Sequence, residues 1–163
     1  MSPSPNFVNN DYFLIFSQHF DRDRGLDMGR LSINSLRKGT IDLWMATSSI
    51  ATKQGFESFH QWGGMLPPQY RVPQLKHWTV QLGPIPLHHV KGVEGNFYKL
   101  LPHEVTTDRN GKRSDFGIHK DANQPGSLGC IVLSDDRFAA FERRMREIRA
   151  EGILQIALFV QYS

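Results

Sequence analysis

The sequence predicts a mainly β domain with one α-helix in its C-terminal half. Of the 163 residues, 14 are glycine and 9 are proline, and this many turn-forming residues favours short strands over a helical bundle. Several segments alternate apolar and polar residues, as strands with one buried face do. Only the segment from Ser134 to Gly152 repeats apolar residues at helical spacing. The length suits one domain with a single core.

The N-terminal part predicts strands joined by turns. Residues 1–10 are rich in Pro, Ser and Asn, and we expect them to form a flexible arm before a domain of residues 11–163. Tyr12 to Gln18 is aromatic and β-branched enough for a first strand. Arg30 to Ile33 and Thr40 to Thr47 flank a turn and predict a β-hairpin.

The middle of the chain predicts shorter strands. Tyr70 to Val72 is expected at a sheet edge, and Trp78 to Leu82 alternates as a strand should. Pro84 and Pro86 restrict pairing after it, and Phe97 to Leu101 begins another strand.

The clearest turn signal is Asp108-Arg109-Asn110-Gly111. The Asn-Gly pair fits a type I′ turn, in which both residues have positive φ. We expect this turn to join a strand at Val105 to Thr107 with a strand at Phe116 to His119.

The C-terminal part predicts the helix and a last strand. Ser134 is placed to cap the helix, and Gly152 is placed to end it. Ile153 to Tyr162 is apolar at almost every position, which is typical of a strand covered on both faces. The apolar face of the helix carries Phe138, Phe141, Met145 and Ile148.

Charge and cysteine content narrow the function classes. The net charge is +3 and the basic residues are spread along the chain, so we expect no nucleic-acid partner. His88 and His89 point to opposite faces of a strand, and we expect no metal site. The single cysteine, Cys130, forms no intrachain disulfide and no zinc site of several thiolates. It is an inert buried thiol, a site for an intermolecular bridge, or a nucleophile.

Residues 116–133, FGIHKDANQPGSLGCIVL, contain groups that can activate this thiol. A thiol has an unperturbed pKa of about 8.5, so a catalytic cysteine needs a base or a positive environment. His119 lies 11 residues before Cys130 and can meet it across adjacent strands. Gly129 allows an unusual backbone angle beside Cys130, where amides can converge on an oxyanion, and the Ser127 hydroxyl can support the turn. From these residues alone, a catalytic and a structural Cys130 are equally open.

The order Gly117-x-His119 and then Ser127-x-Gly129-Cys130-Ile131 resembles the catalytic domain of YkuD-type L,D-transpeptidases. The signature of that family places a His on a strand before an S/T-x-G-C segment. Upstream, GGMLPPQYRV at residues 63–72 is similar to the family segment G…P-x-G-x-Y/F-x-I. Three positions of this chain differ from the common family residues, which are Gly, His and Arg in chain order: Gln69, Leu128 and Val132.

The resemblance implies a β-sandwich in which His119 activates Cys130 without a metal or organic cofactor. The thiolate would attack a carbonyl of a peptidoglycan stem peptide at an L,D-centre and release the terminal D-residue. The acyl group would then pass to an amine or to water. Asp121 or a backbone carbonyl, such as that of Gly117, would orient the imidazole. The residues expected to bind substrate are Gly117, Asp121, Leu128, Tyr70 and His103.

The sequence contains no evident secretion signal or membrane span. We therefore expect the protein to reach the bacterial wall or periplasm on a carrier, such as a phage tail or a secretion apparatus. An alternative function is a non-catalytic virion or secretion-machine component that retains the fold. A third is a wall-binding module that uses the surface aromatics Trp62, Tyr70 and Trp78.

Overall fold

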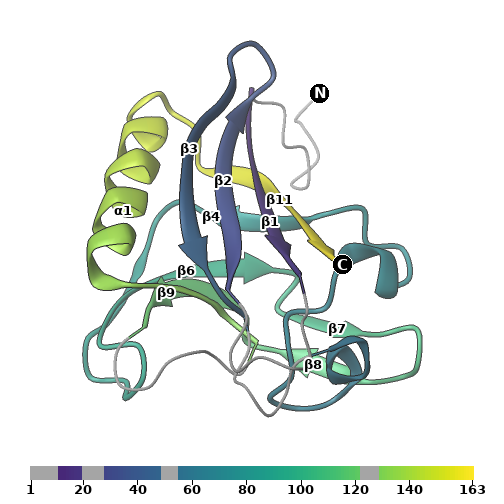
Figure 1. Cartoon of the computed structure of the whole chain (residues 1–163). Coiled ribbons are helices and arrows are strands. Elements are labelled where there is room, and N and C mark those ends of the chain that lie inside the picture. The colour runs from purple at the N-terminus through teal and green to yellow at the C-terminus, as the bar shows by residue number, and fades with distance from the viewer. Residues whose placement is uncertain (1–10, 20–27, 49–54, 122–128) are drawn as a thin grey trace, which may run out of the picture.

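The structure is mainly β, and the described residues contain one α-helix, α1 (Figure 1). The structure is a computed structural model that describes residues 11–19, 28–48, 55–121 and 129–163. Its elements are β1 (Tyr12–Gln18), β2 (Gly29–Ser35), β3 (Gly39–Ala46), the 3-10 helices η1 (Phe56–His60) and η2 (Gln69–Arg71), β4 (Trp78–Gln81), β5 (Ile85–Leu87), β6 (Gly95–Leu101), β7 (Glu104–Thr106), β8 (Lys112–Ser114), β9 (Gly117–Lys120), β10 (Ile131–Leu133), α1 (Asp135–Ala150) and β11 (Gln155–Tyr162).

Nine of the strands form one mixed sheet. Their order is β10-β9-β6-β4-β11-β1-β2-β3, with β5 paired to β6. The pairs β1 with β11 and β9 with β10 are parallel, and the other pairs are antiparallel. Two further strands, β7 and β8, form a separate hairpin.

The two end strands of this sheet meet. Thr47, directly after β3, pairs with Val132 of β10 through two backbone hydrogen bonds of 3.1 and 2.9 Å. The sheet therefore curls round until its first and last strands touch. The chain around Cys130 is thereby fixed to the predicted hairpin β2–β3. The two-layer sandwich implied by the resemblance stays a prediction.

Helix α1 packs on the inner face of the curled sheet, as its apolar face predicts. The Phe141 ring makes edge contacts with Trp44 of β3 at 5.7 Å and with Tyr98 of β6 at 5.1 Å between centroids. Outside this contact, Arg144 pairs with Asp42 of β3. The buried residues of the helix are the four expected ones, Phe138, Phe141, Met145 and Ile148.

The ends of α1 also lie where the sequence places them. Ser134 is the N-cap residue, but its hydroxyl makes no capping bond and instead accepts a 3.3 Å hydrogen bond from Arg137. Gly152 has φ of +89° just after the last turn, a conformation that favours glycine and ends a helix.

The prediction that the last strand is covered on both faces is wrong. In β11, Ile156, Leu158 and Val160 are buried on the inner face, whereas Phe159 is 38% exposed and Gln161 is exposed on the other. On that other face of β11 Ala157 is buried and its two neighbours are not, and an apolar run does not show which of its residues face solvent.

The partner predicted for the hairpin turn at residues 108–111 is also wrong. The turn joins β7 to β8, while β9 lies in the large sheet between β6 and β10. Asn110 has φ of +62°, but Gly111 is not left-handed, so the turn is not type I′. Gly111 is required for another reason, because a Cβ there would lie 2.4 Å from the His60 carbonyl oxygen.

Two proline-rich segments differ from expectation. Tyr70 lies in the 3-10 helix η2 rather than in an edge strand, and the Arg71 amide donates to the Pro68 carbonyl. Pro86 lies inside β5, which pairs only with β6. A proline is tolerated there because the other side of an edge strand needs no donor.

Candidate functional site

Cys130 lies where the chain enters β10, beside strand β9. The parallel register pairs Ile131 with Ile118 and Val132 with His119. Ile118 and Ile131 are fully buried in the core, so His119 and Val132 point to the opposite face of the sheet. Strand pairing therefore brings the His119 strand beside the segment that begins at Cys130.

The His119 imidazole is held in one tautomer. Its Nδ1 lies 2.8 Å from the Lys120 carbonyl oxygen, which can only accept, so Nδ1 carries the hydrogen. Nε2 is then the acceptor of the neutral ring. The ring is only 8% exposed, and burial lowers the pKa of His119 despite the carbonyl contact. His119 is therefore neutral at neutral pH and able to take a proton at Nε2.

Phe97 of β6 fixes the position of this ring. The two rings stack at 5.9 Å between centroids with an angle of 27°. A Cβ on Gly117 would lie 2.2 Å from Cζ of Phe97. Gly117, expected to bind substrate, thus leaves space for the side chain that packs on His119. No sequence pattern singles out Phe97, because any aromatic residue in a strand would look the same.

The thiol of Cys130 contacts a strained residue that the sequence did not single out. Sγ lies 3.7 Å from the Asp115 carbonyl oxygen and can donate its hydrogen there. Asp115 has φ of +67°, which is uncommon for a residue with a side chain. Its carboxylate lies 3.4 Å from Nε2 of His103. His103, an expected substrate-binding residue, therefore reaches the Cys130 region through Asp115.

Gly129 adopts the unusual backbone angle that the sequence indicates, with φ of +114°. A Cβ there would lie 2.8 Å from Cε1 of Phe116, 2.9 Å from Nη2 of Arg113 and 3.0 Å from the Gly64 carbonyl oxygen. The space beside Gly129 is therefore occupied by other residues of the protein.

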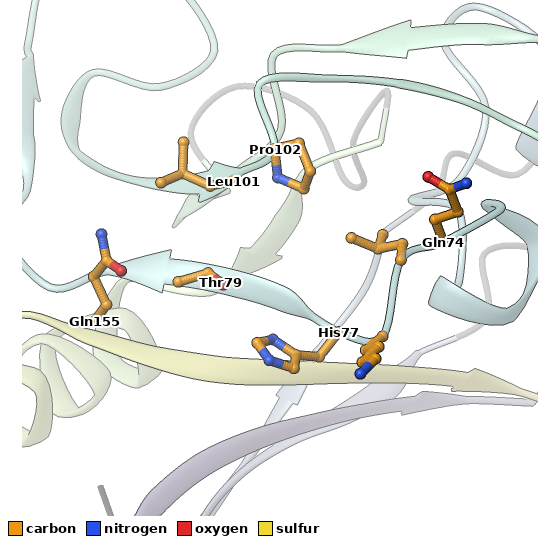
Figure 2. Close-up of a pocket in the computed structure, with 8 residues that line it drawn as sticks. Gln74, His77, Thr79, Leu101, Pro102 and Gln155 are labelled. Carbon is orange, nitrogen blue, oxygen red and sulfur yellow. The ribbon is translucent and has the colours of Figure 1, made fainter. Parts of the chain in front are cut away.

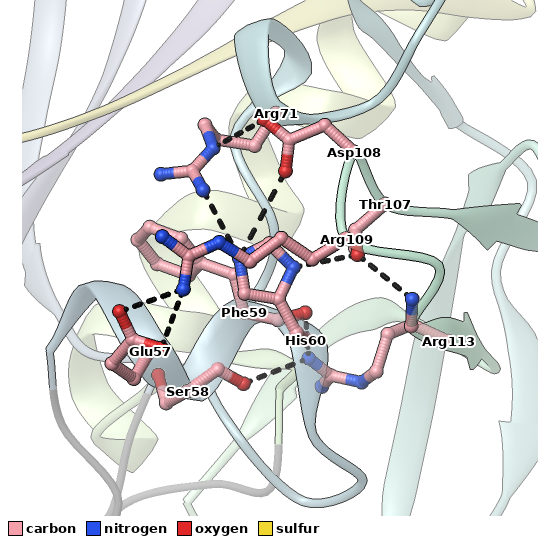
Figure 3. A network of polar contacts seen from close by, with 10 residues as sticks. Glu57, Ser58, Phe59, His60, Arg71, Thr107, Asp108, Arg109 and Arg113 are labelled. Carbon is pink, nitrogen blue, oxygen red and sulfur yellow. Dashed lines mark hydrogen bonds and ion pairs between the residues drawn. The ribbon is translucent and has the colours of Figure 1, made fainter.

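Arg113 of β8 is hydrogen-bonded to four backbone carbonyls, of which Figure 3 shows those of Ser58 and Phe59. Nη2 donates to Gly64 at 2.8 Å, and Nη1 lies 2.8 to 3.3 Å from the carbonyl oxygens of Ser58, Phe59 and Met65. The side chain is buried, with the residue 4% exposed, and burial lowers the pKa of Arg113 to about 10. It stays a cation at neutral pH. The composition and spacing of the sequence did not reveal it.

A polar network holds the β7–β8 hairpin against η1 (Figure 3). Nε2 of His60 accepts a 3.1 Å hydrogen bond from Arg71, so Nδ1 carries the hydrogen that it donates to Thr107 Oγ1 at 2.6 Å. Arg71 also donates to Asp108 at 2.7 Å. Burial first, and then the charge of Arg71, lower the pKa of His60.

The other expected site residues have different outcomes. A backbone carbonyl orients the His119 imidazole, as one of the two alternatives has it, and it is the carbonyl of Lys120 rather than that of Gly117. Asp121 instead donates its backbone amide to Leu133. Tyr70 is 55% exposed on η2. Ser127 and Leu128 lie outside the described residues.

The two pockets beside Pro102 lie away from Cys130 and His119. The pocket in Figure 2 has a volume of about 590 Å³ and lies beside the chain from Gln74 to His77, Pro102 and Gln155. A neighbouring pocket of about 460 Å³ lies across Pro102 from it. Neither is lined by Cys130 or His119, so we assign them no part in the thiol chemistry.

Two further searches concern metals and membranes. In residues 11–19, 28–48, 55–121 and 129–163, no group of three or more His, Cys, Asp or Glu side chains is arranged to hold a metal ion. No helix in the described part of the chain is long and apolar enough to cross a membrane. Comparisons with protein-family models, with curated proteins and with solved structures found no match for this chain.

Proposed function

We propose that the protein is a cysteine acyl transferase or peptidase that acts on peptidoglycan stem peptides. Cys130 is the nucleophile and His119 is the base. The observation that carries this proposal is the parallel pairing of β9 with β10, next to an imidazole whose free nitrogen is an acceptor. Thiol acyl transfer requires a nucleophile and a base that can come within hydrogen-bond reach, and the pairing puts His119 on the strand next to the segment that begins at Cys130.

The reaction takes place in two stages. The Cys130 thiol turns from the Asp115 carbonyl toward His119, and Nε2 takes its proton. The thiolate attacks the stem-peptide carbonyl, a thioester forms and the C–N bond to the terminal D-residue breaks. The imidazolium returns its proton to the leaving amine. Water or an amine then attacks the thioester, frees Cys130 and completes carboxypeptidase, endopeptidase or transpeptidase turnover.

The substrate class rests on the sequence resemblance to YkuD-type domains. The same resemblance supports action at the bacterial wall or periplasm, with a phage tail or secretion apparatus as carrier. His103 and Tyr70 are the exposed candidates for substrate contact, the first because it is linked to Cys130 through Asp115.

A non-catalytic virion or secretion-machine component is the second candidate function. It is favoured by the thiol contact with the Asp115 carbonyl, which gives Cys130 a structural partner. In that case Cys130 would hold the Asp115 turn and no peptide would change.

Product analysis separates the two functions. Purified protein, Cys130→Ala, His119→Asn and His103→Asn are each incubated with purified muropeptides, and the products are identified by mass spectrometry. We expect product from the unchanged protein and from His103→Asn, and at least a hundredfold less from the other two variants. Equal products from Cys130→Ala would overturn the assignment of the nucleophile. Loss of product in Cys130→Ala and His103→Asn, but not in His119→Asn, would move the role of base from His119 to His103.

A further inference from the structure

Arg113 is a buried cation that no carboxylate neutralises within the described residues. The ion pairs of that part of the chain do not include it. Its hydrogen-bond acceptors are the neutral carbonyls of residues 58, 59, 64 and 65. Burying a charge away from water is costly unless an opposite charge or strong hydrogen bonds compensate it. Carbonyl dipoles offset part of this cost but leave a net positive charge in the site.

Two groups near Arg113 can become anions. The Tyr162 phenolate and the Cys130 thiolate would each raise the pKa of Arg113 and so stabilise its charged form. Tyr162 does not fill this role, because burial raises the pKa of its phenol and its hydroxyl donates to the Leu66 carbonyl at 2.7 Å. Cys130 follows Gly129, whose Cβ position is 2.9 Å from Nη2 of Arg113. The Cys130 thiolate is therefore the anion that the Arg113 guanidinium can stabilise.

His119 cannot supply this positive charge in the resting protein. Its ring is buried and neutral, with Nδ1 bound to the Lys120 carbonyl. A neutral imidazole can accept the thiol proton, but it carries no charge that would lower the pKa of the thiol in the resting protein. Among the described residues, Asp115 contacts the thiol through its carbonyl and its carboxylate pairs with His103.

We propose that Arg113 is a positioning residue for the thiol chemistry, whose fixed charge stabilises the Cys130 thiolate while His119 acts as the neutral base. The carbonyls of the 58–65 segment hold the guanidinium beside Gly129 and keep it from moving toward solvent. This inference rests on the proposed function for its purpose. Its physical content, a cation that favours the thiolate, is measured without any peptidoglycan substrate.

The test is the pH dependence of Cys130 alkylation by iodoacetamide in the folded protein. We expect Arg113→Met to move the pH of half-maximal alkylation upward by about one unit, which lowers the rate at neutral pH about tenfold. Arg113→Lys keeps the charge and should keep most of the low-pH reactivity. Ser48→Ala is the matched control, because it removes a hydrogen bond to Gly129 without changing any charge.

Each outcome decides one question. An upward shift in Arg113→Met that Arg113→Lys and Ser48→Ala do not show supports the inference. The same profile in all folded variants overturns it. If Arg113→Met does not fold, Arg113→Gln is measured in its place, because it keeps hydrogen-bond donors for the carbonyls without the charge. An upward shift in that variant supports the inference, and an unshifted profile overturns it. Reactivity that depends on Arg113 without muropeptide products would contradict the proposed function and leave this inference standing.

Discussion

The Ser48 hydroxyl donates a 2.9 Å hydrogen bond to the Gly129 carbonyl, across 81 positions of the chain. The same oxygen accepts a 2.9 Å bond from the Leu66 amide. With the Thr47–Val132 bridge, these contacts tie the end of β3 to the start of β10. An N-terminal hairpin therefore sets the position of a cysteine far along the chain.

Replacement of Ser48 by alanine is expected to destabilise the protein. It leaves the buried Gly129 carbonyl and the Leu66 amide without their partner, which costs about 1–3 kcal/mol of the free energy of unfolding. Urea denaturation measures this loss. Ser114→Ala, at an exposed hydroxyl, is the control and should change stability by less than about 0.5 kcal/mol. Equal effects of both changes would show that the Ser48 bridge adds little.

Two glycines separate backbone strain from crowding. Gly129 and Gly152 both have positive φ, but a Cβ on Gly129 meets three groups within 3.0 Å, whereas nothing lies within 4 Å of one on Gly152. Gly152→Ala should cost about 1–2 kcal/mol from the backbone alone. Gly129→Ala should cost at least about 1 kcal/mol more from overpacking. Chemical denaturation gives both values, and similar losses would contradict the crowding at Gly129.

The packing of Phe97 over Gly117 predicts a strong coupling between these residues. Gly117→Ala alone should destabilise the protein, because its methyl group would meet the ring that stacks on His119. In a Phe97→Ala background the same change should be milder, with a coupling energy of about 1–3 kcal/mol. A double-mutant cycle by urea denaturation measures this coupling. Additive effects would mean that the ring does not occupy that space.

The protein should lose stability as the pH falls below about 6.5. The pKa of His60 is lower in the folded state than in the unfolded chain, so its contribution is present above the unfolded value and lost as the pH drops through the folded one. Protonation of Nε2 breaks the bond from Arg71. His119 acts in the same direction, while the pKa of Asp108 is lowered and that residue titrates further down. Unfolding free energies at pH 7.5, 6 and 5 should therefore fall less steeply in His60→Gln. An unchanged slope in that variant would remove His60 from the explanation.

Local sequence patterns predicted the strands and the helix well where the spacing of apolar residues is enough to determine the element. The first strand, the β2–β3 hairpin and the four buried residues of α1 follow from alternation and helical spacing. The partner of the 108–111 turn was wrong, because a turn sequence does not determine which strand continues into a distant sheet.

The site could be predicted only in part for the same physical reason. Cys130, His119 and Gly129 are close in sequence and share a recognisable order. Arg113, Asp115 and Ser48 reach Cys130 or Gly129 through tertiary contacts. Arg, Asp and Ser residues are common on protein surfaces, so the sequence does not single these three out. Arg113 is buried only because the chain folds so that residues 58–65 surround its guanidinium.

The most direct test of the central claim is a search for the acyl-enzyme on Cys130. The protein is incubated with purified stem-peptide muropeptides, quenched in acid and examined by intact mass spectrometry and peptide mapping. We expect Cys130 to gain the mass of the donor minus that of its released D-amino acid, and Cys130→Ala to gain none. Products formed without any adduct, at the same rate in Cys130→Ala, would contradict it.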